Sequence, residues 1–297
     1  MTSSGAPRIP VLAVVGVGLI GGSFAAALRQ AGVAQRVLGV GRHRDALTRA
    51  LSLGLVDEIT SLEQAAAKAD LILLATPVGS MAGILSEIRP VLREGALITD
   101  AGSTKGGLVA AAARALGPRI GQYVPAHPIA GGEQAGPEAA QASLFRGRHV
   151  VLTPTALTDA GAIVRITRVW EACGAHVMQM TPEAHDRVLA SVSHLPHFLS
   201  SVFMWQIAMA EDSDLRLTLA GTGFRDVTRI AAGSSEVWRD IFLANRDAVL
   251  HELDALRDAL DQAQQALQAG DGEALRNFLE RAAVARRFWG SRSGFDD

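Results

Sequence analysis

The chain lacks the features that would commit it to a nucleic acid or to a disulfide framework. Its 28 Lys and Arg residues nearly balance 30 Asp and Glu residues, which gives a formal net charge of −2. No global positive field therefore attracts polyanions. A single cysteine, Cys173, cannot form an internal disulfide, and this suits a reducing compartment. No motif surrounds Cys173, so we expect it to be a buried hydrophobic side chain.

Long apolar runs are also scarce, with one exception that could be mistaken for a signal peptide or a membrane span. Residues 9–28 carry no charge and follow Arg8, as such segments often do. Four glycines interrupt the window, however, and their spacing has another meaning. We therefore expect a soluble, cytoplasmic protein with no membrane partner. Its 297 residues, 48% of them hydrophobic, suffice for two domains with cores.

The glycines in that window follow a dinucleotide-binding pattern. A β-rich run, "VLAVV", precedes the G-x-G-x-x-G spacing, and a helical segment and a second apolar run, "RVLGVG", follow it. In this motif the glycines permit a tight turn, close approach of backbone to pyrophosphate, and close helix–strand packing, while helix N–H groups face the phosphates. Glycines that merely serve packing are the alternative. The cofactor-binding residues predicted here are Gly16, Gly18, Leu19, Ile20 and Gly21.

The residue after the second strand bears on which nicotinamide cofactor is used. An acidic side chain there would bind the ribose 2′-hydroxyl of NAD and repel a 2′-phosphate. The chain instead has "GRHRD", in which Arg42 and Arg44 are cationic. Arg42 therefore favours NADP over NAD, unless both arginines are ordinary solvated charges.

Two more apolar runs, "DLILLATPV" and "GALITDAGSTKG", continue the alternation of strands and helices. Ligands of open α/β sheets lie at the carboxyl ends of the strands. We therefore expect Thr76, Pro77 and Ser103 at the rim of the cofactor cleft, although Ser103 could simply cap the helix that begins near Lys105. His127 follows the next short strand, "QYVPA", and should lie on the same rim. The small residues after it leave space for cofactor and substrate.

The chain becomes helical from about residue 182. We place a dinucleotide-binding α/β domain with a parallel sheet at residues 1–181 and an all-α domain at residues 182–297. A long helix should follow Thr181, with His194 and His197 on one face if it persists through Pro196. No third ligand lies near this H-x-x-H pair, so we expect no metal.

The helical half also holds a charged turn and a long apolar seam. In "GFRDVTR", Arg225 and Arg229 are four residues apart, an unfavourable pair unless Asp226 or a bound anion compensates. A solvated turn is the alternative. Residues 236–268 should form one helix whose apolar positions pack against a helix of the same chain or of a second subunit. These positions are Val249, Leu253, Leu256, Leu260, Ala263 and Leu267.

Taken together, the segments "GVGLIGGS", "ATPV", "TDAGSTKG", "HPIAGGEQAG", "SHLPH" and "GFRDVTRIA…WRDIF" resemble the prephenate/arogenate dehydrogenase family of tyrosine biosynthesis. The resemblance runs in order over residues 10–289. It implies a Rossmann-like domain, a helical domain that forms a homodimer, and hydride transfer to NAD or NADP. The substrate would be a small dianion, prephenate or arogenate, that is oxidatively decarboxylated. Which of the two it is stays open.

The resemblance also assigns roles to particular residues. It implies that His127 is the general base for the substrate hydroxyl and that Ser103 binds the same hydroxyl and orients the histidine. It implies that Arg229 clamps a substrate carboxylate. Weaker assignments place four residues around the substrate: Glu133, His197, Asp226 and Trp238.

Two other functions remain as alternatives. A β-hydroxyacid dehydrogenase would share the two-part organisation but would rely on a lysine in the helical domain, and residues 182–270 contain none. A dinucleotide-sensing regulator without catalysis would keep the glycines. It would not need His127, Ser103 and Arg229 together, so we expect an enzyme.

Overall fold

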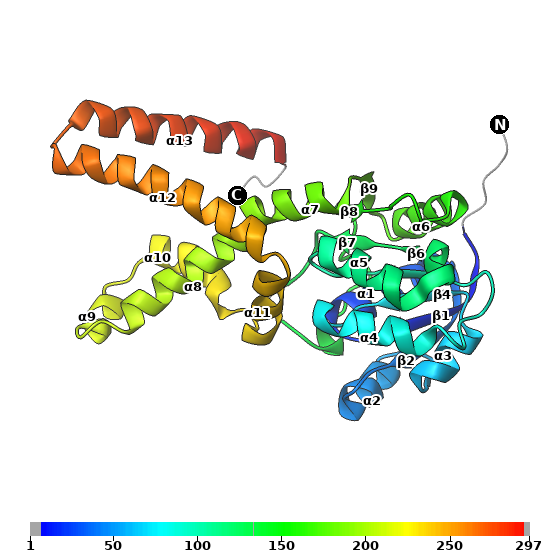
Figure 1. Ribbon diagram of the computed structural model, residues 1–297. Helices are drawn as coiled ribbons and strands as arrows, with labels where there is room; N and C mark the ends of the chain where they lie inside the picture. The colour runs from blue at the N-terminus through cyan, green and yellow to red at the C-terminus, as the bar shows by residue number, and fades with distance from the viewer. Residues whose placement is uncertain (1–6, 133, 294–297) are drawn as a thin grey trace. The chain divides into compact units, whose positions relative to one another are not determined.

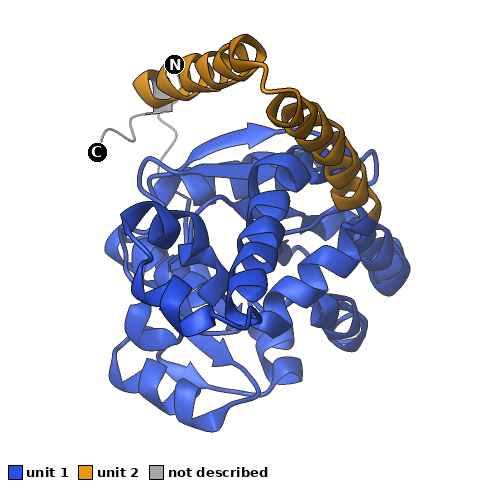
Figure 2. Cartoon of the chain, turned by 90° about the vertical axis from the view of Figure 1, so that its left-hand side faces the viewer, with its two compact units in different colours: residues 1–246 blue, residues 247–297 orange. Residues whose placement is uncertain are grey.

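The computed structural model describes residues 7–132 and 134–293. It divides into two compact units, residues 1–246 and 247–297 (Figure 2), and each is considered by itself below. The predicted domain boundary at residues 181 and 182 stays a prediction.

A six-stranded parallel sheet forms the centre of the first unit. The strands are β1 (Ile9–Val15), β2 (Ala34–Val40), β3 (Glu58–Ile59), β4 (Leu71–Leu74), β5 (Leu97–Asp100) and β6 (Tyr123–Val124). They lie in the order β3-β2-β1-β4-β5-β6. This is the order of a doubly wound dinucleotide-binding fold, whose ligand crevice opens where the order reverses, between β1 and β4. The expected Rossmann-like sheet is therefore confirmed.

Helices cover both faces of this sheet (Figure 1). Alternate residues of β1 face opposite sides, so Leu12 and Val14 join one buried cluster while Ala13 and Val15 join the other. Phe24 of the helix after β1 packs on Trp170 in the first cluster, with ring centroids 4.6 Å apart. The helices of this region are α1 (Leu19–Gln30), α2 (Arg44–Ser52), α3 (Leu62–Lys68), α4 (Val78–Ile88), α5 (Gly106–Leu116) and α6 (Ala160–Ala172).

Three further strands form a second, separate sheet. β7 (Ala126–Pro128) pairs antiparallel with β8 (His149–Leu152), which pairs parallel with β9 (His176–Gln179). β8 and β9 do not extend the six-stranded sheet. Pro125 separates β6 from β7, and its carbonyl accepts a hydrogen bond from Thr153 N, 3.0 Å. The chain thus leaves the parallel sheet just before His127.

The expected long helix after Thr181 is interrupted by a wider turn. α7 (Pro182–Leu189) leads into a π-helical turn, η3 (Ala190–His194), and then into α8 (Leu195–Ala208). Pro196 has no backbone N–H and its ring clashes with the carbonyl four residues earlier, so a regular α-helix cannot pass through it. Such π-turns often occur at functional sites.

Shorter helices complete the first unit. α9 (Ser213–Thr218), α10 (Thr222–Thr228), the 3-10 turn η4 (Arg229–Ala232) and α11 (Ser235–Ala244) follow α8, and both α10 and η4 pack against α8. The expected single helix over residues 236–268 is wrong, because α11 ends before Asn245 and a new helix begins at Arg246. Asn245 is buried and uses its side chain in contacts described below.

The second unit is a helical hairpin (Figure 1). It comprises α12 (Arg246–Gln268) after its first residue and α13 (Gly272–Ser293). The chain reverses at Gly270, whose φ of 64° favours glycine. Large apolar side chains remain exposed on both helices, among them Leu260 (57%), Leu267 (66%), Leu279 (62%) and Phe288 (61%). Among the described residues, no helix has the length and hydropathy needed to cross a bilayer.

Candidate active site

The glycine loop after β1 fits a dinucleotide. Gly16 has φ 96°, and a Cβ there would lie 2.5 Å from Ala75 O. A Cβ on Gly21 would lie 2.1 Å from Gly16 O, so both positions require glycine for the fold itself. Gly18 differs, because a Cβ there would meet no heavy atom within 4 Å. Gly18 is the N-cap of α1 and makes no side-chain cap bond, which leaves room for a phosphate at the helix start.

The other predicted cofactor residues border the same crevice. Leu19 and Ile20 are the first residues of α1. Thr76 and Pro77 follow β4, the neighbour of β1, and the Thr76 hydroxyl contacts Ser80 Oγ at 3.0 Å. Arg42 is exposed just after β2, the other neighbour of β1. The residues thus surround the strand ends where this fold binds its cofactor.

His127 lies on β7, opposite Val151 of β8. Its neighbours on the strand are fully buried and its own ring is half-buried. Nδ1 lies 2.8 Å from Nε2 of His185. Burial holds the pKa of His127 well below 6.5, and a positive charge on His185 or Lys105 would act in the same direction. The ring is therefore neutral near pH 7.

His185 in turn contacts a carboxylate. Its Nδ1 lies 2.8 Å from Oδ1 of Asp186, and His185 has no exposed surface. The Asp186 carboxylate also accepts hydrogen bonds from Lys105 N and Gly106 N, each 2.8 Å. Burial would raise the pKa of Asp186, but these three hydrogen bonds lower it below 3.8. Asp186 is therefore ionised, and it caps α5 from a position far along the chain.

Lys105 anchors the same region from inside the protein. Its ammonium is fully buried, forms an ion pair with Asp100 and donates to Ala126 O at 2.7 Å. Asp100 also accepts from Tyr123 Oη (2.8 Å) and Ala126 N (3.0 Å). The buried charges are thus paired and hydrogen-bonded, as buried ions must be. Both backbone polar groups of Ala126 are fixed, and this holds the residue before His127.

Ser103 lies half-buried in the turn between β5 and α5. The suggestion that Ser103 caps α5 is wrong, because the N-cap is Lys105 and no local side chain caps the helix. Asp186 takes that role instead. Ser103 therefore remains a candidate for the substrate hydroxyl, at the carboxyl end of β5.

On the helical side, an aromatic cluster contains two of the predicted substrate residues. His197 of α8 stacks on Trp238 of α11, with ring centroids 3.4 Å apart and planes 24° apart. His194 meets the same indole edge-on, with centroids 6.3 Å apart. Burial, together with the positive charge of Arg229, lowers the pKa of His197 to about 4. Arg229 therefore lies close enough to His197 to influence it.

Asn245 links this cluster to the buried carboxylate. Its side-chain amide donates to the backbone oxygen of Asp186 at 2.7 Å and contacts His194 Nδ1 at 3.1 Å. The break between α11 and α12 is therefore part of the network. The connection between His127 and the helical side runs through His185, Asp186, Asn245, His194, Trp238 and His197.

The remaining predicted substrate residues lie outside this buried network. Asp226 is exposed on α10 and pairs with Arg225 across 3.8 Å. Arg229 is also exposed, at the start of η4. Glu133 lies outside the described residues. The structure thus gives His197 and Trp238 a shared environment, but it does not do so for Asp226.

The sequence alone assigned no role to four residues of the network, which are Lys105, His185, Asp186 and Asn245. His185 and Asp186 sit in a segment that looks like an ordinary helix, and Asn245 sits inside an apparently continuous one. Lys105 did carry a signal, because the chain contains only two lysines and this one stands in the "GSTKG" turn after a strand. Asp186 lies 81 and 80 residues from its partners Lys105 and Gly106, and His185 lies 58 residues from His127, so local sequence spacing cannot reveal them.

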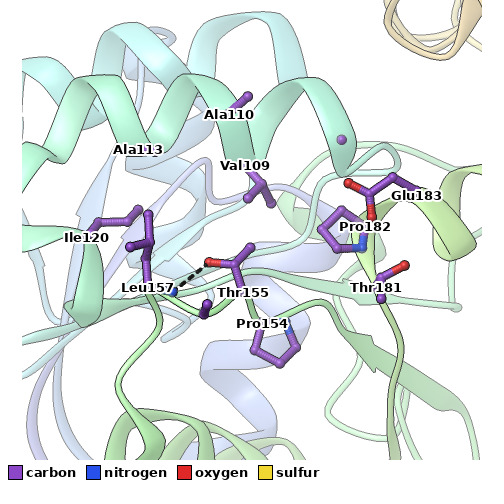
Figure 3. Close-up of a pocket in the computed structure, with 12 residues that line it drawn as sticks. Val109, Ala110, Ala113, Ile120, Pro154, Thr155, Leu157, Thr181, Pro182 and Glu183 are labelled. Atoms are coloured by element: carbon purple, nitrogen blue, oxygen red, sulfur yellow. Dashed lines mark hydrogen bonds between the residues drawn. The ribbon is translucent and has the colours of Figure 1, made fainter.

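A pocket of about 490 Å³ between α5 and α7 contains none of the predicted site residues (Figure 3). Its lining is mainly apolar, and it includes Val109, Leu157 and Pro182. Thr155 Oγ1 accepts a hydrogen bond from Leu157 N there, 3.2 Å. The pocket is lined by Gly106, the first residue of α5, and by none of the predicted cofactor residues.

The parallel sheet, the glycine loop and the neutral histidine at its rim define a nucleotide-dependent dehydrogenase. The chain belongs to the prephenate dehydrogenase family: the family model for the nucleotide-binding domain matches residues 24–179, and that for the dimerization domain matches residues 181–281. It is therefore an enzyme with a nucleotide-binding domain, as expected from the sequence.

Relatives of known name are similar over most of the chain. A prephenate dehydrogenase of Bacillus subtilis is 34% identical over 91% of this chain and 73% of its own length. A cyclohexadienyl dehydrogenase of Zymomonas mobilis is 34% identical over 93% of this chain and 94% of its own.

Solved structures agree with these relatives. A prephenate dehydrogenase of Aquifex aeolicus in complex with hydroxyphenyl propionate and NAD+ has a TM-score of 0.89 and 35% identity, covering 95% of this chain and 99% of the other. Synechocystis arogenate dehydrogenase has a TM-score of 0.79 and 30% identity, covering 94% and 99%. A 3-hydroxyisobutyrate dehydrogenase of Salmonella typhimurium, at 18% identity and a TM-score of 0.55, shares the fold alone.

Proposed function

We propose that the protein catalyses the oxidative decarboxylation of prephenate to 4-hydroxyphenylpyruvate, or of arogenate to tyrosine, in tyrosine biosynthesis. Membership of the family supports this, as do relatives named for prephenate, cyclohexadienyl and arogenate substrates. The observation that carries the proposal is a single one. His127 follows the carboxyl end of β6 as a neutral ring with its Nδ1 already engaged by His185.

The chemistry needs little more than positioning and one proton acceptor. The substrate is a cyclohexadiene with a C4 hydroxyl and a ring carboxylate. A nicotinamide held by the glycine loop would supply the acceptor for the hydride that leaves C4. His127 accepts the hydroxyl proton, and the electron pair of the breaking bond to the ring carboxylate enters the ring as CO2 leaves. The proton then returns from His127 to the phenolate oxygen, which gives the hydroxyl of the product. The ring becomes aromatic, so the protein mainly orients the groups and polarises the hydroxyl.

His127 acts as the general base through Nε2. A base must be unprotonated at working pH, and burial of the ring keeps it so. We assign Ser103 to the same hydroxyl, because it lies at the end of β5 close to the turn that Lys105 anchors. General-base assistance of this kind typically contributes about 10²–10⁴-fold in rate.

The anionic groups of the substrate would be bound by residues of the helical region. Arg229 would bind a carboxylate with its planar guanidinium, which can donate two parallel hydrogen bonds. Its closeness to His197 and the stacking of His197 on Trp238 support a shared binding surface. Asp226 and Glu133 are assigned to hold or gate that surface. The boundary between cofactor and substrate domains is placed at residues 181 and 182, a position that the two family models support.

We assign NADP as the preferred cofactor. Arg42 is exposed directly after β2, where a 2′-phosphate would lie in this fold. The two positions directly after β2 are Gly41 and Arg42, neither of them acidic, and this supports the same choice.

The protein is also proposed to act in the cytoplasm as a homodimer through its C-terminal helices. The match to a dimerization domain over residues 181–281 supports the dimer. The exposed apolar side chains of α12 and α13 support it too, because a second copy would bury them. Light scattering should give twice the mass of 31.2 kDa, and a monomer at micromolar concentration would contradict this.

One assay matrix tests the function. Prephenate or arogenate is combined with NAD or NADP, and the absorbance of the reduced cofactor is followed. We expect turnover in at least one NADP well, with a slower rate in the matching NAD well. No turnover in any of the four wells would reject the proposal and leave a non-catalytic dinucleotide sensor or another dehydrogenase.

A further inference from the structure

A chain of three side chains leads from the half-buried His127 into the protein. His127 Nδ1 lies 2.8 Å from His185 Nε2, and His185 Nδ1 lies 2.8 Å from Asp186 Oδ1. His185 has no exposed surface and Asp186 has 8%. Solvent therefore supplies no alternative partners to the His185 ring. Its two nitrogens must form their hydrogen bonds with His127 and Asp186.

The protons on the side chains of His127, His185 and Asp186 have one arrangement when His185 is neutral. An ionised carboxylate can only accept, so His185 must carry its proton on Nδ1. His185 Nε2 is then an acceptor, and His127 must donate to it from Nδ1. That leaves His127 Nε2 without a proton. A doubly protonated His185 would instead donate from its Nε2 to His127 Nδ1. Neutral His127 would then carry its proton on Nε2, and that nitrogen could not act as a base.

The carboxylate at the end of this series of side chains is held by further hydrogen bonds. Asp186 accepts from Lys105 N and Gly106 N, so both of its oxygens are engaged by the first residues of α5. Rotation of its side chain would break these hydrogen bonds and uncap the helix. The position of Asp186 is thus set by α5, and the orientation of His185 is set by Asp186.

We infer that His185 is a positioning residue for the proposed reaction, which holds His127 in the tautomer with a free Nε2, and that Asp186 holds His185 in the matching tautomer. The inference rests on the proposed role of His127 as base. His185 also stabilises the positive charge that forms on His127 during turnover. When Nε2 of His127 takes the substrate proton, the hydrogen bond from its Nδ1 to His185 becomes charge-assisted and so stronger.

The tautomer of His127 in the unmodified protein is the direct test and requires no substitution. The side-chain ¹⁵N shifts of histidine distinguish a protonated from an unprotonated ring nitrogen, and His127→Asn identifies the signals of that ring. At pH 7 we expect Nδ1 protonated and Nε2 unprotonated. A His127 protonated at Nε2, or doubly protonated, would overturn the inference.

Two substitutions of His185 separate positioning from packing. His185→Phe keeps a planar ring but removes the acceptor for His127. His185→Gln offers a carbonyl oxygen that can accept the same hydrogen bond. We expect His185→Phe to lower kcat by about 10²-fold while KM stays within a few-fold, and we expect His185→Gln to recover part of the loss. The Phe variant should also show His127 with protons on both nitrogens in turn, as a tautomer mixture.

His176→Phe is the matched control, because His176 is an exposed histidine on β9. It should leave kcat and the His127 signals unchanged. Wild-type kcat in His185→Phe would overturn the inference, and so would a loss of kcat with the His127 tautomer unchanged. If His185→Phe does not fold, the wild-type tautomer decides. The inference and the proposed function fail separately, since the tautomer is measured without turnover.

Discussion

The surroundings of His127 and of Arg229 differ in how firmly the protein holds them. Around His127, the groups of Lys105, Asp186 and His185 are buried and hydrogen-bonded to one another. Around Arg229, the three elements α9, α10 and η4 contain no buried residue over their described lengths. The contrast assigns different tasks. A proton acceptor needs fixed geometry and a dry environment, whereas an anion-binding arginine can be held by its ligand.

The helical region also exposes much apolar surface. Trp205 and Met209 are each 66% exposed and Leu219 is 76% exposed. A single chain leaves these side chains in water, which is unusual for so many large residues in one region. Burial of these side chains by a partner copy or by ligand would order the helical side, whereas the groups around His127 are already buried and hydrogen-bonded.

Removal of the base should have the largest effect. His127→Asn is expected to lower kcat by about 10²–10⁴-fold while substrate binding is retained, because the proton acceptor is lost and the anion contacts are not. Steady-state kinetics measures both. His149→Asn, an exposed histidine on the neighbouring strand β8, is the control. An unchanged kcat would remove His127 as the base.

Removal of the guanidinium should act mainly on binding. Arg229→Ala is expected to raise KM by about 10–10²-fold, the value of a lost charged hydrogen bond of about 1.5–3 kcal/mol, with a smaller change in kcat. Arg168→Ala on the exposed face of α6 is the control. If KM is unaltered, the carboxylate binds elsewhere and the contrast between the two sides is mistaken.

Cofactor choice tests the rim of the sheet. Arg42→Ala is expected to lower the ratio of kcat/KM for NADP to that for NAD by about tenfold, since one charge-assisted contact to the 2′-phosphate is lost. The KM for substrate serves as the internal control and should not change. A constant ratio would show that Arg42 is only a solvated charge.

The pH profile should reflect the burial of His127. Its pKa is held well below 6.5, and only the neutral ring accepts a proton. Activity should therefore persist as pH falls through 6.5 and should be lost only at distinctly lower pH. A fit of kcat/KM against pH measures this. An acid limb centred at or above 6.5 would contradict the buried environment.

The smallest effect concerns stability. Burial lowers the pKa of His194 to about 4 from 6.5, so below pH 6.5 the unfolded chain binds a proton that the folded chain does not. The free energy of unfolding should therefore fall as pH drops from 6.5 to about 4. Thermal unfolding across this range should show it, and His194→Gln should flatten the dependence. An equally steep dependence in the variant would assign the effect to other groups.

Local patterns predicted the cofactor side of the molecule well. The glycine spacing and the alternating strands foretold the sheet and its crevice, because a tight turn and a buried strand each depend on neighbouring residues. The structure adds the physical reason at Gly16 and Gly21, where a side chain would collide with backbone. It distinguishes Gly18, where a Cβ would meet no heavy atom of the protein within 4 Å.

Long-range pairings were beyond reach from the sequence. Asp186 caps α5 in place of Ser103, and Asn245 interrupts what its apolar spacing predicted to be one helix. Both depend on partners dozens of residues away, which local propensity does not report. The separate sheet of β7, β8 and β9 was missed for the same reason. The roles given to Ser103, Asp226 and Glu133 stay predictions.

The central claim is that one ligand contacts both His127, the general base, and Arg229 of the helical region. A crystal structure with 4-hydroxyphenylpyruvate and NADP bound is its most direct test. We predict that the ligand 4-hydroxyl lies about 2.6–3.2 Å from His127 Nε2 and that its carboxylate faces the helical side at Arg229. A ligand whose hydroxyl is bound by other groups, with the His127 ring turned away from it, would contradict the account.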